Sequence, residues 1–276
     1  MISVFGSTGF VGSEFISTYS DECVAVSRES SEPLSDDVLY FISTVDNYNI
    51  YDDPYLDINT NLIKLIDVLE SCRKSNKNTV FNFVSSWFVY GKTDSLPAKE
   101  TSVCNPNGFY SITKHAAERL LISYCETYNI PYRILRLTNI IGSTDKKVSK
   151  KRNAIQYMIG LLKENKEVKL YDDGGHIRDY MDVKDCCRAI KTTLDTAPKN
   201  VTINISNSEP TKIGDIIKHA KRKIGSESKI SYIPTPEFHK IVQIQDMFLD
   251  NTRLLELGYK PSISTLESIN MLLENR

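Results

Sequence analysis

A tyrosine and a lysine four residues apart, Tyr110 and Lys114, are the residues of this chain best suited to acid–base chemistry. A phenol beside an ammonium group can exchange a proton with a substrate oxygen, because the positive charge favours the phenolate. The same spacing recurs at Tyr180 and Lys184, and with 15 tyrosines in the chain one accidental pair is expected. Tyr110 opens a predicted helix after the turn-forming segment 105–108, so Tyr110 and Lys114 share one helix face. Context therefore favours the first pair.

Two hydroxyls, Ser85 and Ser86, follow the apolar run Val80 to Val84, which predicts a strand. At the carboxyl edge of a sheet they would lie where open parallel sheets bind ligands. A serine pair alone more often caps a strand end. Together with Tyr110 and Lys114, these hydroxyls favour a catalytic site in which one serine holds the substrate oxygen.

A glycine-rich turn, Gly6-x-x-Gly9-x-x-Gly12, follows the first apolar run and opens a helix. Glycines in this context let a pyrophosphate approach backbone N–H groups at a helix N-terminus. The alternative is a tight turn without a ligand, which the spacing and context disfavour. The sequence therefore predicts a dinucleotide site with contacts from Gly6, Thr8, Gly9, Phe10, Val11 and Gly12.

The second predicted strand ends in Val26-Ser27-Arg28, at the position where an acidic residue usually binds the ribose hydroxyls of NAD. A hydroxyl and a guanidinium suit the 2′-phosphate of NADP instead. Ser27 and Arg28 thus predict NADP, with NAD as the less favoured cofactor. In the alternative, Arg28 is a solvated loop residue and Glu29 binds the ribose.

Alternating apolar runs and amphipathic stretches predict an α/β fold, a Rossmann-type doubly wound parallel sheet with a smaller C-terminal substrate-binding region. Residues 1–142 would form the dinucleotide-binding domain, to which 176–206 returns. Residues 143–175, which include the basic loop 146–152, and residues 207–276 would form the substrate-binding region. Only residues 29–37 separate the second strand from the third, which leaves little room for a helix. The expected strands are 2–5, 23–26, 38–42, 79–84, 132–137 and 201–205, and the long helices are 58–72 and 110–128.

Composition excludes several classes of function. The formal net charge is −1, so no overall field favours nucleic acid or a membrane surface, and any bound anion needs a local site. No apolar run could span a bilayer and no signal peptide precedes the first strand, so a cytoplasmic location is expected. The six cysteines lack paired spacing, which predicts reduced thiols and no metal site.

With these motifs the chain resembles the extended short-chain dehydrogenase/reductase family, which comprises the NAD-dependent epimerases, dehydratases and reductases of nucleotide sugars. The resemblance extends over essentially the whole chain. Besides the glycine turn, it rests on Ser85-Ser86 with Val89-Tyr90-Gly91, Tyr110-Ser111-Ile112-Thr113-Lys114, Arg136-Leu137-Thr138-Asn139-Ile140-Ile141-Gly142, and the segment from Arg178 to Asp185.

The resemblance implies a role for each matching residue. Tyr110 would be the general acid/base, Lys114 would bind the nicotinamide ribose and lower the pKa of Tyr110, and Ser86 would bind the substrate oxygen. Asn139 and Arg178 would contact the diphosphate of a nucleotide-sugar substrate. Alternatively, Arg178 pairs with Asp179 or Asp182, and Asn139 stabilises its own turn. A later arginine of the family is absent, and His239 or Lys240 is the candidate to replace it.

The two residues that follow Ser86 narrow the set of possible reactions. Dehydratases of the family carry an Asp-Glu pair where this chain has Trp87 and Phe88, and neither ring can transfer a proton, so a 4,6-dehydratase is disfavoured. Enzymes that combine reduction with 3,5-epimerisation carry a cysteine in place of Phe88 and a histidine near Asn153, so that combination is disfavoured too.

The sequence therefore predicts an enzyme, and specifically an NADPH-dependent reductase of a nucleotide-linked 4-keto-6-deoxyhexose. One alternative is a nucleotide-sugar 4-epimerase with retained NAD(P). Another, of a different class, is a non-catalytic regulatory protein that binds the dinucleotide. The resemblance also implies a homodimer formed through the helices 58–72 and 110–128.

Overall fold

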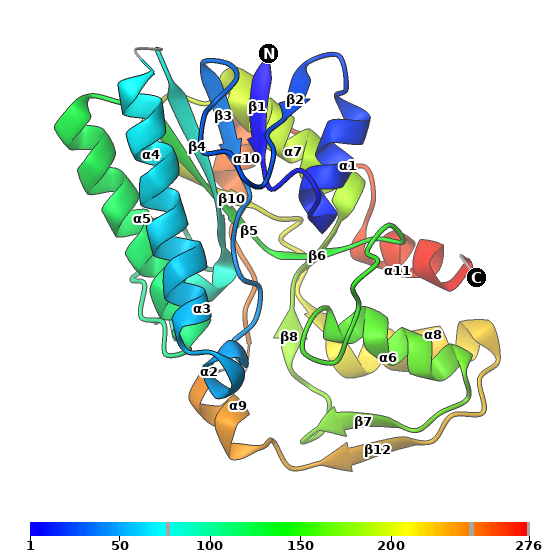
Figure 1. The fold of residues 1–276 in the computed structure, drawn as a ribbon. Helices are drawn as coiled ribbons and strands as arrows, with labels where there is room; N and C mark the ends of the chain where they lie inside the picture. The colour runs from blue at the N-terminus through cyan, green and yellow to red at the C-terminus, as the bar shows by residue number, and fades with distance from the viewer. Residues whose placement is uncertain (76–77, 243–245, 275–276) are drawn as a thin grey trace.

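Six parallel strands form the central sheet, in the order β10-β5-β4-β3-β1-β2 (Figure 1). The computed structural model describes residues 1–75, 78–242 and 246–274. The six predicted strands are all present with small differences at their ends: β1 (Ile2–Phe5), β2 (Cys23–Ala25), β3 (Asp37–Tyr40), β4 (Val80–Ser86), β5 (Tyr132–Leu137) and β10 (Val201–Ile205).

Helices cover both faces of this sheet. Alternate residues of each strand point to opposite faces, so that Val4 and Leu39 belong to one core and Phe5 and Tyr40 to the other. The first core includes α1 (Phe10–Thr18), α7 (Val183–Thr196) and α10 (Thr252–Glu256). The second includes α4 (Lys64–Lys74) and α5 (Phe109–Tyr128). The predicted doubly wound α/β fold is confirmed.

The connection from β2 to β3 contains no helix, as its length predicts. From β1 the chain runs to β2 on one side and then crosses to β3 on the other. The carboxyl ends of β1 and β3 therefore flank the point where the strand order reverses, which is where open parallel sheets bind ligands.

The predicted helix 58–72 is not continuous. It consists of α3 (Tyr55–Ile58), a π-helical segment (Asn59–Ile63) and α4. The π turn brings the side chain of Asn61 into the protein, where it is buried and fully engaged in hydrogen bonds. The prediction of one continuous helix over residues 58–72 was therefore wrong.

A smaller region lies beside the carboxyl edge of the sheet (Figure 1). Its own apolar core gathers side chains from α6 (Ala154–Lys163), β7 (Val168–Tyr171), β9 (Tyr180–Asp182), α8 (Ile213–Ile224) and α11 (Thr265–Glu274). Three short strand pairs complete it: β6 (Asn139–Ile141) with β9, β8 (Ile177–Arg178) with β11 (Thr211–Lys212), and β7 with β12 (Ile230–Ile233). Strand β10 lies in the main sheet, whereas the exact domain boundaries stay a prediction.

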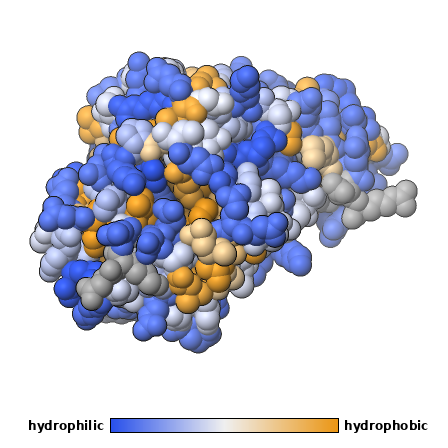
Figure 2. Space-filling view, turned by 90° about the horizontal axis from the view of Figure 1, so that it is seen from above, coloured by the Kyte–Doolittle hydropathy of each residue, from blue (hydrophilic) through white to orange (hydrophobic). Residues whose placement is uncertain are grey.

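Three short helices complete the described chain: α2 (Asn49–Asp52), the 3₁₀ helix Trp87–Tyr90 and α9 (Glu237–Val242). No helix in the described ranges is long and apolar enough to cross a membrane. The face seen in Figure 2 is mainly hydrophilic, with apolar side chains in separate small patches.

Candidate active site

One cleft of about 1220 Å³ opens at the carboxyl edge of the sheet, between the sheet and the smaller region. It brings together every residue that the sequence predicts for the site. These are Gly6, Thr8, Gly9, Phe10, Val11, Gly12, Ser27, Arg28, Ser86, Tyr110, Lys114, Asn139 and Arg178. Their individual roles stay predictions.

The glycine turn folds tightly back on itself at the end of β1. Gly6 has a backbone φ of +79°, which residues with a side chain rarely adopt. The Gly9 N–H donates to the Gly6 carbonyl at 3.0 Å. A Cβ at Gly12 would lie 2.4 Å from the same carbonyl oxygen. The backbone at the start of α1 is thus open to the cleft, and its N–H groups and dipole suit a dinucleotide pyrophosphate.

The end of β2 contributes Ser27 and Arg28 to the cleft, but not Glu29. The Ser27 hydroxyl donates to the Glu29 carboxylate, and the Glu29 N–H donates to the Ser27 oxygen at 3.3 Å. The hydrogen bond from Ser27 lowers the pKa of Glu29. The guanidinium is therefore the charged group of this turn that lines the cleft.

Helix α5 holds Tyr110 and Lys114 one turn apart and buries both. The helix begins with reciprocal bonds at Gly108, whose N–H donates to the Ser111 hydroxyl at 3.0 Å while that hydroxyl donates to the Gly108 carbonyl at 2.8 Å. The Lys114 ammonium lies 4.0 Å from the centre of the Phe83 ring. Burial lowers the pKa of Lys114 to about 7, which the charge of Glu118 opposes.

The Tyr110 hydroxyl has a raised pKa in this structure, because burial disfavours the phenolate. Hydrogen bonds from Ser86 and Ser43 act in the opposite direction but do not outweigh burial. The expectation that the charge of Lys114 lowers this pKa therefore differs from the observed direction. Tyr110 is held here as a neutral phenol, the form that can donate a proton.

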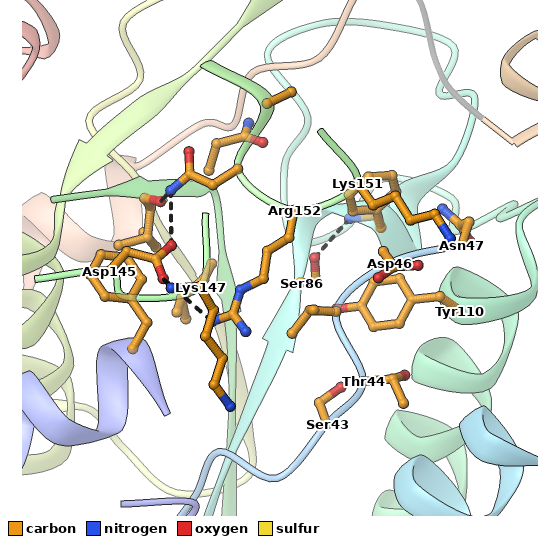
Figure 3. A pocket seen from close by; sticks show the side chains of 18 of the residues that line it. Ser43, Thr44, Asp46, Asn47, Ser86, Tyr110, Asp145, Lys147, Lys151 and Arg152 are labelled. Atoms are coloured by element: carbon orange, nitrogen blue, oxygen red, sulfur yellow. Dashed lines mark hydrogen bonds and ion pairs between the residues drawn. The ribbon is translucent and has the colours of Figure 1, made fainter. Parts of the chain in front are cut away.

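Ser86, which the resemblance assigns to the substrate oxygen, interacts with the Tyr110 side chain, and its role stays a prediction. It ends β4, is partly exposed, and accepts a hydrogen bond from Phe88 N–H at 3.3 Å. Figure 3 shows its hydroxyl beside Tyr110 in the cleft. Ser85 is buried, and its hydroxyl has no hydrogen-bond partner among the described residues.

A polar cluster around Asn61 supports the Tyr110 side of the cleft, and sequence reasoning missed it. The Asn61 side chain accepts from the Ser43 hydroxyl at 3.0 Å and donates to Thr44 and Thr113 hydroxyls at 2.9 and 3.0 Å. Ser43 and Thr44 follow β3, so their place after a strand at the carboxyl edge was a usable signal.

These elements match a known family. The model of the NAD dependent epimerase/dehydratase family matches residues 35–206, more than half of the chain. The chain belongs to this family. Its members are enzymes of the NAD(P)-dependent extended short-chain dehydrogenase/reductase class that act on nucleotide sugars, and the resemblance read from the sequence is confirmed.

Individual relatives are distant. The chain is 25% identical over 221 residues to the UDP-glucose 4-epimerase of Mycolicibacterium smegmatis, which covers 79% of this chain and 68% of the relative. It spans about a third of the length of the trifunctional Arabidopsis thaliana enzymes that it also matches.

Solved structures share the fold over nearly the full length. A UDP-glucose 4-epimerase of Thermotoga maritima with UDP-glucose superposes with a TM-score of 0.89 at 23% identity, covering 99% of this chain and 97% of that one. RMD of Pseudomonas aeruginosa complexed with NADPH has a TM-score of 0.83 at 21% identity, with the same coverages. At these identities the likeness establishes the fold.

Asn139 of β6 and Arg178 of β8 also line the cleft. The Asn139 amide donates to the Asp179 carbonyl at 3.0 Å, which joins β6 to β9 rather than stabilising its own turn. Arg178 is buried, lies 5.4 Å from the centre of the Trp87 ring, and donates to the Ile177 carbonyl at 2.8 Å. The Asp182 carboxylate accepts from Lys184 N–H at 2.9 Å and from the Ser268 hydroxyl at 2.8 Å.

His239, rather than Lys240, lines this cleft. Its ring Nε2 is hydrogen-bonded to the Tyr48 hydroxyl and lies 3.4 Å from the Tyr171 hydroxyl, so α9 bridges the two sides of the cleft. Lys240 is exposed and pairs with Glu237 at 2.5 Å. Of the two candidates for the missing family arginine, His239 is the one that lines this cleft, and its role stays a prediction.

The second tyrosine and lysine pair has a different setting. Tyr180 is a buried residue of strand β9, and Lys184 lies in α7 after the capping residue Asp182. The two residues share no helix face, so the first pair remains the candidate acid and base.

Proposed function

We propose that this enzyme is an NADPH-dependent reductase of a nucleotide-linked 4-keto-6-deoxyhexose. The observation that carries the proposal is the end of β2, where Arg28 and Ser27 line the cleft and the Glu29 carboxylate does not. A guanidinium binds a 2′-phosphate by charge-assisted hydrogen bonds and gains little from the bare ribose of NAD. An enzyme that consumes NADPH performs a net reduction.

The residues of the cleft suit the cofactor. Gly6, Thr8, Gly9, Phe10, Val11 and Gly12 would hold its pyrophosphate, Ser27 and Arg28 its 2′-phosphate, and Lys114 its nicotinamide ribose. When bound, NADPH supplies the hydride of the reaction. Asn139 and Arg178 would hold the diphosphate of the nucleotide sugar.

The proton of the reduction would come from Tyr110. A phenol whose pKa is raised by burial is protonated at neutral pH and can donate to the oxygen that becomes the alcohol. Ser86, which lies beside it, would donate a hydrogen bond to the same oxygen. The aromatic pair Trp87 and Phe88, stacked 3.9 Å apart, supplies no group that could expel water from the sugar, so dehydration is not proposed.

A 4-epimerase with retained NAD(P) is the second candidate, because the relatives named UDP-glucose 4-epimerase are similar over most of the chain. An assay separates the two. Purified enzyme is incubated with NADPH and UDP- or dTDP-linked 4-keto-6-deoxyhexose while absorbance at the nicotinamide band is followed. Stoichiometric loss of NADPH in this incubation supports the reductase. A parallel incubation with UDP-glucose and NAD tests the epimerase, which would invert carbon 4 of that sugar without net change of the cofactor.

The homodimer also belongs to this proposal. Apolar side chains on the helices that would pair are exposed, among them Ile66 on α4 and Ile112, Leu120 and Tyr128 on α5. Burying them against a second copy would stabilise the pair of chains. Sedimentation analysis of the wild type and of Ile112→Lys tests this, since a dimer through α5 should dissociate in the variant.

A further inference from the structure

The cleft is far more basic than the chain as a whole. Ten lysine and arginine side chains line it against three carboxylates, in a protein whose net charge is −1. Lys114, Arg178 and Arg28 have proposed roles in the reaction or in cofactor binding. Of the other seven cations, four pair with carboxylates: Lys151, Arg152, Lys166 and Lys169. The cleft still carries an excess of positive charge, which favours an anionic ligand.

The loop between β6 and α6 supplies four of these cations: Lys147, Lys150, Lys151 and Arg152. Figure 3 shows Lys147 and Arg152 extending into the cleft from the side opposite Tyr110. Lys147 and Lys150 are exposed, and neither forms an ion pair with a carboxylate in the described part of the chain. Their charges are available to a ligand.

The Asp145 carboxylate organises this loop from within. It accepts a hydrogen bond from Lys147 N–H at 3.1 Å and from the Asn153 amide at 3.3 Å, and it lies 3.8 Å from the Arg152 guanidinium. The Asp145 side chain is only 2% exposed, although its backbone lies at the surface. A buried carboxylate at the base of the loop orients Arg152 and the Lys147 backbone toward the cleft.

Two contacts fix the loop to the dinucleotide-binding part of the protein. The Thr144 hydroxyl donates to the Glu14 carboxylate on α1 at 3.0 Å, and Lys151 lies 3.6 Å from Asp52 and above the Tyr48 ring at 5.2 Å. The loop thereby runs along the cleft from α1 to α2. A group bound there would lie between the two sides of the cleft.

We propose that Lys147, Lys150 and Arg152 form a second phosphate-binding subsite, which takes a diphosphate group on the side of the cleft opposite Tyr110. The inference rests on the proposed function, in which the substrate and the cofactor each carry a diphosphate. Clustered ammonium and guanidinium groups bind such a dianion through charge-assisted hydrogen bonds, and the guanidinium adds bidentate geometry.

Equilibrium binding tests the subsite without any turnover. Trp87, the single tryptophan of the chain, lines the cleft and its fluorescence reports occupancy. Wild type, the double variant Lys147→Gln/Arg152→Gln and the control Lys146→Gln are titrated with UDP, dTDP, inorganic pyrophosphate and NADPH. Lys146 belongs to the same loop but does not line the cleft, so its variant controls for the loss of one loop charge.

The double variant should bind at least one of these probes about tenfold more weakly than wild type, while Lys146→Gln binds as wild type does. Weakening confined to UDP and dTDP assigns the subsite to the substrate diphosphate, and weakening confined to NADPH assigns it to the cofactor. The charge-conserving variant Lys147→Arg/Arg152→Lys should retain most of the affinity.

Equal affinity of wild type and the double variant for all four probes overturns the subsite. So does equal weakening by Lys146→Gln, because the effect would then belong to loop charge in general. An enzyme that binds diphosphates through this loop but reduces no keto sugar would refute the proposed function and leave the subsite standing.

Discussion

The two sides of the cleft hold their polar groups in opposite ways. Tyr110 and Lys114 are buried, and Asn61 fixes Ser43 beside them through hydrogen bonds. Across the cleft, Lys147 and Lys150 are exposed and extend from a loop. Groups that transfer a proton gain from fixed geometry, whereas groups that attract a charged ligand act over longer distances. The comparison therefore predicts effects on rate from one side and on affinity from the other.

Removing the phenol should give the largest effect. Tyr110→Phe deletes the proposed proton donor and should lower kcat about 10²- to 10⁴-fold with little change in NADPH binding. Steady-state rates and NADPH titration measure the two separately. Tyr128→Phe, an exposed position on the same helix, is the matched control and should behave as wild type. Wild-type turnover by Tyr110→Phe would show that the Tyr110 hydroxyl is not the proton donor.

A methyl group in the glycine turn should damage both fold and cofactor binding. The Cβ of Gly12→Ala would lie 2.4 Å from the Gly6 carbonyl oxygen, which should destabilise the protein by about 1–3 kcal/mol and weaken NADPH binding. The control is Gly160→Ala in α6, whose Cβ meets nothing within 4 Å and which should stabilise the protein by roughly 0.5–1 kcal/mol. Thermal unfolding and NADPH titration report both. A protein that tolerates Gly12→Ala would contradict the tight packing of α1 against the Gly6 carbonyl.

The turn after β2 should decide which cofactor is bound. Arg28→Gln removes the guanidinium proposed for the 2′-phosphate and should weaken NADPH binding about tenfold or more while NADH binding stays unchanged. Glu29→Gln serves as the neighbour control, because Glu29 does not line the cleft. If Glu29→Gln weakens NADH binding and Arg28→Gln leaves NADPH binding intact, the preference is for NAD.

The buried ammonium of Lys114 should lower the free energy of unfolding by an amount that depends on pH. Its pKa falls from 10.5 to about 7 on folding, so the protein carries the full cost of the charged form below pH 7 and regains stability as pH rises from 7 toward 10.5. Lys114→Met should therefore be more stable than wild type by at least ~1 kcal/mol at pH 6, about 2–4 °C in Tm, and the difference should shrink by pH 9.

Unfolding curves at several pH values check this prediction. The variant should at the same time lose most of its activity, because the proposed ribose contact is gone. A Tm difference that is constant between pH 6 and pH 9 would show that Lys114 is not buried as a charge in the folded enzyme.

Much of the cofactor side was predictable from the sequence, because its signals are local. Each strand is an apolar run with its own turn, and the glycine spacing and the pair Tyr110 and Lys114 are read within one element. The Asn61 cluster could not be predicted from the sequence. The π turn at Asn61 accompanies hydrogen bonds to Ser43 and Thr113, which are far away in the sequence. Burial likewise decides the pKa of Tyr110, and burial is a property of the assembled fold.

The substrate side was harder to predict for the same reason. The loop 146–152 is visibly basic, but only the folded chain brings Asp145 beneath it and turns Lys147 and Arg152 toward the cleft. The choice of His239 over Lys240 also depends on contacts with Tyr48 and Tyr171 from other parts of the chain.

Transfer of a label from the cofactor tests the proposed reduction most directly. The enzyme is incubated with NADPH deuterated at both positions of nicotinamide carbon 4 and with a nucleotide-linked 4-keto-6-deoxyhexose, and the product is analysed by mass spectrometry and NMR. We predict one deuterium at carbon 4 of each product sugar and one NADPH consumed per sugar. A reduced sugar without deuterium, or a 4-keto sugar left unreduced with no loss of NADPH, would contradict the account.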